Sequence, residues 1–432
     1  MTDKMPEFTP RLSAVSRDRY KIKFLEDGYP GKEIGNETHC HPIYGVYVIR
    51  DYLFQYRKTK EMKYQDAAIK VANAAIHRME TFRNALVFWY KKDSPFNSTS
   101  KEYYSGLTQS YYAEIFAQVY KLTNISIYKD AAKKVYASLK IPVSLGGVFH
   151  NSSKGPSIQE YPMSPNGYVL NGWLSTISAI KNYADILQDA EAENFWTDNL
   201  LTLSKLLPLY DAPYFLNSRY TLNGMTTVKL FSPSTQFELQ RVNLIVPDED
   251  SYELKIDSKR RYANFIEGSS VLQKNGKILT RKNTALLKVL LSRFSYPKEN
   301  ELSIKLFSPH TAKIQIFIAQ PQYFPTKIIE PQKSASYHFI KEVSLQKGLN
   351  DIKVKLPWEP LDAIGIPTTF KQFGSKWHNV YHFIHIDKLN YFYEMTNKKQ
   401  LLDYSTKWKK YTDSWINNPL YDGLEKSPYQ GG

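Results

Sequence analysis

The spacing of apolar residues changes twice along this chain, and the change limits the folds open to it. Up to about residue 220, apolar residues recur every three to four positions, as on one face of a helix. From about Thr221 to Ile364 apolar and polar residues alternate, as in "NDIKVKLPW", which predicts strands with one buried face. Helical spacing then returns. The sequence therefore predicts a β module that interrupts a helical domain.

The helical segments group into four pairs with short connections. Three pairs precede the β module, and "KWHNVYHFIHIDKLNYFYEMT" with "KKQLLDYSTKWKKYTDSWI" forms the fourth. The third pair opens with the predicted helix "NGYVLNGWLSTISAIKNYADIL". Such pairs favour an (α/α)4 toroid whose inner helices line a cleft. We expect an α+β protein, with toroid parts at residues 1–220 and 366–432 and an antiparallel β-sandwich at 221–365.

The net charge of +15 bears on partners rather than on fold. The basic residues are scattered, without a long Lys/Arg run or a nucleic-acid-binding motif, so we expect no nucleic acid partner. A solvated basic surface and an anionic polymer partner are the remaining interpretations. Aromatic residues make up 14% of the chain. Tyrosine suits sugar clefts, because its ring is apolar and its hydroxyl forms hydrogen bonds.

The cellular compartment is predicted from what the sequence lacks. The single cysteine, Cys40, excludes an intrachain disulfide. The segment "MTDKMPEFTPRLSAVSRDRYKIKF" has no apolar core of a secretory signal, and no run approaches the roughly 18 apolar residues of a membrane span. We expect a cytoplasmic protein, whose charge permits peripheral contact with the inner membrane or a lipid-linked glycan.

Two short motifs carry residues suited to chemistry. Glu160 and Tyr161 lie just before a predicted helix, where a carboxylate and a phenol could serve as base and donor, although a surface loop is the commoner role of such a dipeptide. His382 and His385 share a helix face, but no third ligand is evident, so packed histidines are favoured over a metal site. The chain has no dinucleotide fingerprint, phosphate loop or nucleophile elbow, and we expect no cofactor.

Four ordered segments together resemble the heparosan glucuronyl C5-epimerases. "YPMSPNGYVLNGW" is similar to that family's "EYPTTPSSFVLNGF", and the segment at Tyr104, Ser105 and Gln109 is similar to "WYSAMAQGQA". "LPLYD" matches literally, and "VYHFIHIDKL" with "YSTKWKKYTDSW" resembles "DYHTTHINQL" with "FVKRWKSYL". The resemblance covers roughly residues 39–211 and 375–416.

The resemblance implies a catalytic toroid that acts on glucuronate within a glycan. It assigns catalytic roles to Glu160, Tyr161 and Tyr381, and to Tyr220, with Tyr214 as the competing assignment because the spacing differs. The same matched segments supply the candidate substrate-binding residues Tyr104, Gln109, Asn171, Tyr210, Tyr214, His382 and His385.

The chain also departs from the family's pattern. The family's "YDLRH" corresponds here to residues 220–224, "YTLNG", which lack the acidic and basic side chains. The β module has no counterpart at this position, since in the animal enzymes a β region precedes the toroid. Because of the missing acidic and basic side chains, the family's carboxylate clamp has no counterpart at residues 220–224.

The resemblance implies a C5-epimerase that converts D-glucuronate to L-iduronate, in a bacterial capsule, O-antigen or lipid-linked glycan. Such a reaction needs two proton-transfer groups flanking C5 and hydrogen-bond donors that neutralise the substrate carboxylate. Glu160 and Tyr381 are the expected pair, Tyr161 and Tyr220 the expected donors, and His382 or His385 could supply charge that lowers a tyrosine pKa. The substrate partner would be an anionic uronate-containing glycan.

Two other functions fit the same residues. A uronate lyase begins with the same deprotonation at C5, and a non-catalytic protein could bind acidic glycan without altering it. The β module is either a carbohydrate-binding unit or a brace for the cleft, and in the second role it could also support a homodimer.

Overall fold

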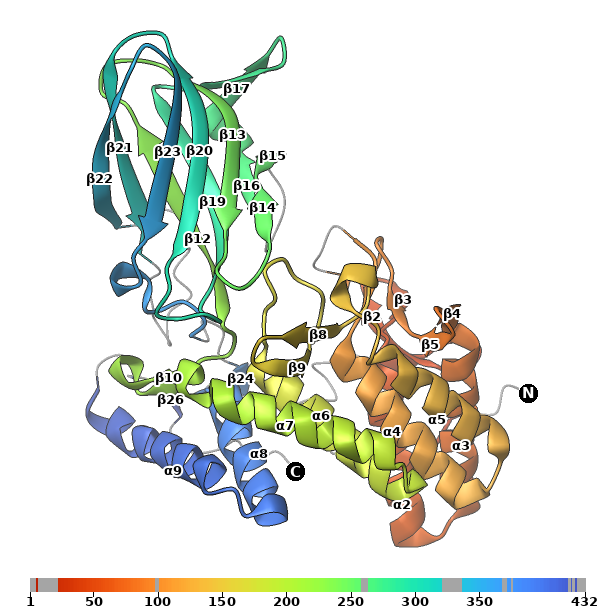
Figure 1. Cartoon of the computed structure of the whole chain (residues 1–432). Coiled ribbons are helices and arrows are strands. Elements are labelled where there is room, and N and C mark those ends of the chain that lie inside the picture. The colour runs from red at the N-terminus through yellow and green to blue at the C-terminus, as the bar shows by residue number, and fades with distance from the viewer. Residues whose placement is uncertain are drawn as a thin grey trace.

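The structure is a computed structural model of the chain. It describes residues 5–6, 22–97, 101–257, 263–320, 336–366, 371–373, 376–418, 421 and 424–425. The helices and the two large sheets occupy separate parts of the molecule, which confirms the expected α+β class (Figure 1). Over these residues, none of the helices has the length and apolarity needed to cross a membrane.

Eight helices form four consecutive pairs. They are α2 (Tyr44–Thr59) with α3 (Met62–Arg78), α4 (Gly106–Thr123) with α5 (Ser126–Ser138), α6 (Leu170–Leu187) with α7 (Ala190–Tyr210), and α8 (Val380–Thr396) with α9 (Lys399–Ser414). In every pair the first helix ends at a residue with a positive φ, namely Lys60, Asn124, Gln188 and Asn397. A left-handed residue at the helix end lets the chain turn back at once, so each pair is a tight hairpin.

The first helices of the pairs are neighbours in space. Helix α4 packs against α2 and α6, and α6 also packs against α8. One buried apolar cluster runs through all four pairs and includes Trp173 of α6 and Trp408 of α9. We call α2, α4, α6 and α8 the inner helices.

Helix α6 begins later than the spacing of apolar residues predicts. Its expected start was Asn166, but the helix starts at Leu170. Tyr168 has a φ of 50°, and its N–H donates to Gln159 Oε1 at 3.0 Å. This side chain competes with the helical hydrogen-bond pattern, and the segment before Leu170 is held as a loop.

Short strands connect one helix pair to the next, and the sequence predicts few of them. Before α2 lie β1 (Ile22–Phe24), β2 (Pro30–Ile34) and β3 (Glu37–Cys40), which form one antiparallel sheet. Three hairpins follow between helices: β4 (Glu80–Phe82) with β5 (Ala85–Val87), β6 (Trp89–Tyr90) with β7 (Tyr103–Tyr104), and β8 (Phe149–Ser152) with β9 (Gly155–Ile158).

The β module consists of two sheets around one core. The first has the order β15-β16-β19-β12-β21-β22, and the second β17-β18-β13-β20-β23, with β14 paired to β13. The strands are β12 (Asn223–Phe231), β13 (Glu238–Ile245), β14 (Ser251–Glu253), β15 (Lys255–Asp257), β16 (Phe265–Glu267), β17 (Val271–Lys274), β18 (Lys277–Thr280), β19 (Thr284–Ser292), β20 (Asn300–Ser308), β21 (Ala312–Ala319), β22 (Tyr337–Leu345) and β23 (Gly348–Leu356). Alternate side chains such as Leu302, Ile304 and Leu306 are buried between the sheets, as the period of two predicts.

The chain enters and leaves the β module through one stem. Tyr220 N donates to Gly365 O at 2.7 Å, and the buried Arg219 guanidinium binds the Asp362 carboxylate at 2.8 Å and the Ile364 carbonyl at 2.6 Å. Short strands β10 (Asp211–Ala212) and β11 (Asn217–Ser218) precede the stem, and β24 (Lys371–Phe373), β25 (Lys376–His378) and β26 (Leu424–Glu425) form a small sheet near the last helix pair.

The module also contacts the loop that leads into α6. The Tyr168 and Phe294 rings stack with centroids 4.7 Å apart, and Asn166 N donates to Glu249 Oε2 at 3.0 Å. Figure 1 shows the module projecting away from the helices above this loop. The loop is therefore held between the helical part and the module.

Candidate active site

Glu160 lies at the point where the loop after β9 meets the inner helices. Its carbonyl accepts a hydrogen bond from Gly106 N at 3.0 Å, at the start of α4. Its carboxyl group lies over Gly172 in the first turn of α6, so closely that a methyl group on Gly172 would fall 2.3 Å from Oε2. Two inner helices thus fix the position of this carboxyl group.

The environment of the Glu160 carboxyl group favours proton transfer near neutral pH. Its Oε2 is buried and has no hydrogen-bond partner among the described residues. Burial raises the pKa of Glu160 to about 7. Because the charged form lacks solvation, the carboxyl group gives and takes a proton at a pH where an ordinary glutamate is always ionised.

Aromatic rings line one side of Glu160. Tyr90 and Tyr103 stack with centroids 5.0 Å apart, and Tyr103 lies 6.3 Å from the ring of Tyr161. Burial, together with the nearby Glu160 carboxylate, raises the pKa of Tyr103 to about 12, so this phenol keeps its proton. A protonated phenol can donate a hydrogen bond but cannot act as a base at neutral pH.

His41 continues this aromatic wall toward α2. Its ring stacks on Tyr44 with centroids 4.2 Å apart and lies edge-on to Tyr90 at 6.0 Å. Burial lowers the pKa of His41 to about 3, so the imidazole is neutral. His41 therefore contributes a flat ring rather than a positive charge.

Tyr220 and Tyr381 lie beside each other near the start of α6. Their ring centroids are 4.7 Å apart, and the Tyr220 carbonyl accepts a hydrogen bond from Leu170 N at 2.8 Å. The Glu160 carboxyl group and the Tyr220 carbonyl thus both contact the first turn of α6, and the Tyr381 ring packs on that of Tyr220, although Glu160 and Tyr381 are more than 200 positions apart in the chain.

The two candidates for the fourth catalytic tyrosine lie in very different surroundings. Tyr214 is 78% exposed, and its ring contacts Phe215, whereas Tyr220 is partly buried beside Tyr381. Under the reaction that the resemblance implies, Tyr220→Phe should reduce C5 proton exchange on a glucuronate glycan by about a hundredfold, the loss typical of one preorganised hydrogen-bond donor. The matched control Tyr214→Phe should leave the exchange rate unchanged. The reverse order of effects would favour Tyr214 instead.

All four inner helices begin around this site. α4 and α6 meet at Glu160, α6 and α8 meet at the Tyr220–Tyr381 pair, and Gly45 at the start of α2 lies against Tyr112 of α4. None of the four has an acidic residue in its first turn. Since a helix carries a partial positive charge at its N-terminus, the site favours an anionic group.

Five of the predicted substrate-binding residues are buried instead. Tyr104 donates its hydroxyl to Ser138 O at 2.8 Å, Gln109 donates to Leu86 O at 2.8 Å, and Tyr210 donates to Tyr168 O at 2.7 Å. These residues hold the hairpins and the loop that carry the site, but they expose almost no surface to a substrate.

The histidines His382 and His385 are the other two. Both are fully buried and share the Ser218 hydroxyl, with Nδ1 to Oγ distances of 2.8 and 2.7 Å. Burial lowers the pKa of His382 to about 4 and that of His385 well below its usual value, so both rings are neutral. The expectation that they hold substrate or lower a tyrosine pKa by their charge is contradicted by this placement.

Asn171 remains close to the site. It is partly buried in the first turn of α6, next to Gly172, and its Oδ1 is buried without a hydrogen-bond partner among the described residues. No group of three or more His, Cys, Asp or Glu side chains in the described ranges could hold a metal ion.

Residues 221–224, where the family's charged residues are missing, support the loop before α6. The Thr221 hydroxyl donates to Gly167 O at 2.5 Å, and Asn223 Nδ2 donates to Pro165 O at 3.2 Å. Leu222 N also donates to Gly167 O at 3.0 Å. This segment therefore fixes the loop and supplies no charged clamp.

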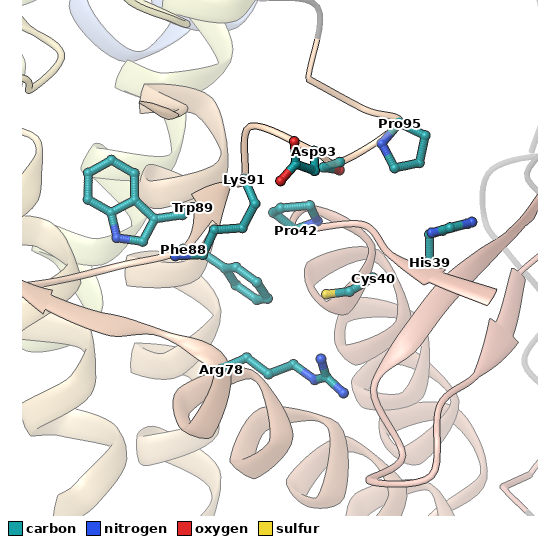
Figure 2. Close-up of a pocket in the computed structure, with 10 residues that line it drawn as sticks. His39, Cys40, Pro42, Arg78, Phe88, Trp89, Lys91, Asp93 and Pro95 are labelled. Atoms are coloured by element: carbon teal, nitrogen blue, oxygen red, sulfur yellow. The ribbon is translucent and has the colours of Figure 1, made fainter. Parts of the chain in front are cut away.

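A cavity of about 310 Å³ lies next to the aromatic wall. It is lined by His39, Cys40, Pro42, Arg78, Phe88, Trp89, Lys91, Asp93, Ser94 and Pro95. Figure 2 shows Arg78 reaching toward it from the end of α3, with Lys91 and Asp93 on the opposite side. The lining residues flank His41 and Tyr90 in sequence, so the cavity adjoins the wall that leads to Glu160.

Sequence reasoning missed His41, Tyr90, Tyr103 and Gly172. Tyr90 and Tyr103 stand in strands of two residues, which contain no measurable period, and His41 opens the first predicted helix. Gly172 carried a usable signal, because a glycine inside an otherwise strongly helical segment indicates a close approach by another group.

Comparison with known proteins finds that part of the chain is similar to one family. Residues 77–244 match the family described as "D-glucuronyl C5-epimerase C-terminus". The D-glucuronyl C5-epimerase of Caenorhabditis elegans is 26% identical over 121 residues, which are 25% of this chain and 20% of that protein. An uncharacterised protein of Methanocaldococcus jannaschii is 24% identical over 131 residues, which are 29% of this chain and 42% of that protein. The chain thus matches less than half of the length of either relative.

Among solved structures, the GH76A α-1,6-mannanase from Salegentibacter sp. HEL1_6 aligns with 55% of this chain and 56% of its own, at a TM-score of 0.36 and 12% identity. The segment that carries Glu160, Tyr161 and Tyr220 lies within the part of the chain that is similar to the D-glucuronyl C5-epimerase C-terminal family.

Proposed function

We propose that this protein is a C5-epimerase that converts D-glucuronate to L-iduronate residues within an anionic glycan. The observation that carries the proposal is the placement of the Glu160 carboxyl group, with a pKa of about 7, where the inner helices begin. The match of residues 77–244 to the epimerase family supports it. The helical part would act as a four-pair toroid, with the site at one end of its inner helices.

The first step is removal of the proton on C5. Glu160 accepts this proton, and the C–H electron pair moves into the adjacent carboxylate to form an aci-carboxylate. Tyr381 then donates its phenolic proton to the opposite face of C5, and the carboxylate is restored. The stereochemistry inverts with no net change in atoms, and solvent returns both residues to their starting protonation states.

The aci-carboxylate carries extra negative charge that must be stabilised. The hydroxyl groups of Tyr161 and Tyr220 donate to it, and the positive ends of the inner helices lie around it. These helix ends would take the place of the charged clamp that residues 221–224 lack. The adjoining cavity is lined by Trp89 and by Arg78, whose guanidinium also pairs with Asp27 at 2.6 Å, and it would hold a neighbouring sugar.

Incubation with glucuronate polymers in heavy water tests the proposal directly. We expect deuterium at C5 and new iduronate signals in the NMR spectrum of an otherwise intact chain. Tyr381→Phe should lower the formation of iduronate by two to four orders of magnitude, the usual contribution of a general acid or base. An unsaturated, ultraviolet-absorbing product would instead identify a lyase, and unchanged glycans that bind the protein would identify a non-catalytic binder.

A further inference from the structure

An aromatic platform lies on the solvent-facing side of the first sheet of the β module. It consists of Phe231, Phe317, Tyr337 and Phe339 together with Lys229, on the adjacent strands β12, β21 and β22. The register puts Lys229 opposite Phe317, and Phe317 opposite Phe339, in one row across the strands. Figure 1 places β22 at the free edge of the module.

The aromatic residues of the platform are not core residues. The inward side chains of these strands are Val228, Leu230, Ile316 and Ile318, which are all fully buried. On the outward face Tyr337 is 37% exposed and Phe339 is 49% exposed. A solvated face of an antiparallel sheet is ordinarily polar, and clustered exposed rings indicate a binding surface.

Lys229 stands among three of these rings. Its Nζ lies 5.6 Å from the Phe231 ring centroid, 5.2 Å from that of Phe317 and 5.4 Å from that of Tyr337. Lys229 makes no ion pair with any other described residue, whereas its neighbour Lys288 is paired with Glu267 at 3.3 Å. The platform therefore offers a positive charge that is held by rings and available to an anion.

We propose that this platform binds the uronate chain at a second site, away from the chemistry at Glu160. The rings provide flat surfaces for the C–H faces of sugars, and Lys229 is complementary to a uronate carboxylate. The net charge of +15 favours the same anionic partner. The inference rests on the proposed function for the identity of the glycan, and it gives the inserted module the role of holding a polymer near the site.

The test is affinity electrophoresis of the full chain through gels that contain heparosan. Using the Glu160→Gln background prevents turnover, so that only binding is measured. We expect Lys229→Gln combined with Phe339→Ala to raise the Kd by about tenfold, because one charge pair and one stacked ring are lost. The matched control removes a lysine and an exposed apolar side chain from the outward face of the other sheet, by Lys355→Gln with Leu349→Ala, and should bind as the parent does.

A second ligand tests the contribution of the charge pair between Lys229 and the uronate carboxylate. In heparosan whose carboxylates are reduced to alcohols, the parent should bind more weakly, and Lys229→Gln should no longer distinguish the two polymers. Equal retardation of parent and platform variant, or equal losses in platform and control variants, overturns the proposal. A dimer that dissociates in the platform variant also overturns it, because the occupant would then be a second copy of the chain.

Different results would overturn the binding proposal and the catalytic proposal. C5 exchange on a short oligosaccharide, measured with Glu160 restored in every variant, reports on the site at Glu160 and should not change when the platform residues are substituted. Loss of platform binding with intact exchange on the oligosaccharide is the expected pattern. Platform binding without any exchange in the wild-type protein would reject the proposed function alone.

Discussion

Glu160→Gln is expected to abolish C5 exchange and, at the same time, to make the protein more stable above neutral pH. The catalytic loss should be about a thousandfold, because glutamine has the same shape but can neither accept nor return a proton. The gain in stability follows from the cost of a buried charge. Stability and activity should thus change in opposite directions, as expected of a residue kept for function.

The direction of the stability change follows from the raised pKa. Glu160 titrates at about 7 in the folded protein and near its ordinary value of 4.5 in the unfolded chain. Between these values the folded state binds more protons than the unfolded state, so the free energy of unfolding falls as pH rises. The decline starts near pH 4.5 and is complete above pH 7, and it amounts to about 3 kcal/mol. Glutamine carries no charge and should remove this decline.

Glu249 offers a matched control. Burial also raises its pKa to about 7, but it lies at the junction with the β module, where it accepts from Asn166 N and Ser292 Oγ. Denaturant unfolding from pH 5 to 9 should show a smaller pH-dependent decline in both variants. With glucuronate as the substrate, Glu160 takes the proton and must be ionised. The exchange rate should therefore rise as the pH increases through 7, both in the wild type and in Glu249→Gln. Retained exchange in Glu160→Gln would falsify its role as the proton acceptor.

Gly172→Ala is expected to remove most of the activity without unfolding the protein. A β-carbon at position 172 would lie 2.3 Å from Glu160 Oε2 and 2.8 Å from its carboxyl carbon, so the carboxyl group must move by about 1 Å to regain ordinary contact. A misplacement of that size at a reacting group costs about a hundredfold in rate. Because alanine has a higher helix propensity than glycine, the fold should be retained.

Gly167→Ala serves as the control from the same loop. The nearest atom to its new β-carbon would be the Met163 sulfur at 3.2 Å, which belongs to a flexible side chain, so near-normal exchange is expected. Circular dichroism and thermal unfolding should show that both alanine variants are folded. In the Glu160→Gln background, Gly172→Ala should add little further loss, since both changes act on one group. Full activity in Gly172→Ala would show that the position of the carboxyl group does not matter.

The large elements of the fold were predictable because their periodicity is strong. Alternation in "ELSIKLF" and "NDIKVKLPW" predicted strands that the structure places at β20 and β23, with Leu302, Ile304, Ile352 and Val354 buried. The hairpins β4–β5 and β6–β7 were missed, since strands of two or three residues contain no measurable period. The start of α6 was misplaced, because a tertiary contact from Gln159 decides where the helix begins.

The candidate site was only partly predictable for a related reason. The resemblance assigned roles to Glu160, Tyr220 and Tyr381. The structure places the Glu160 carboxyl group and the Tyr220 carbonyl against the first turn of α6, with the Tyr381 ring beside that of Tyr220. Polar residues in matched motifs, such as Gln109 and His382, could not be separated by sequence into those that face a cleft and those that satisfy buried groups. Burial decides that question, and burial depends on the packing of helices that are distant in the chain.

The stem beneath the β module has a consequence for how such a chain could arise. Tyr220 N and Gly365 O are directly hydrogen-bonded, so more than 140 residues depart from and return to nearly the same point. An ancestor without them could have closed this position with a tight turn and kept every inner helix in place. Insertion at such a point adds a folded unit at little entropic cost to the host. Tyr220, at the foot of the module, has its position set by both the helical part and the module.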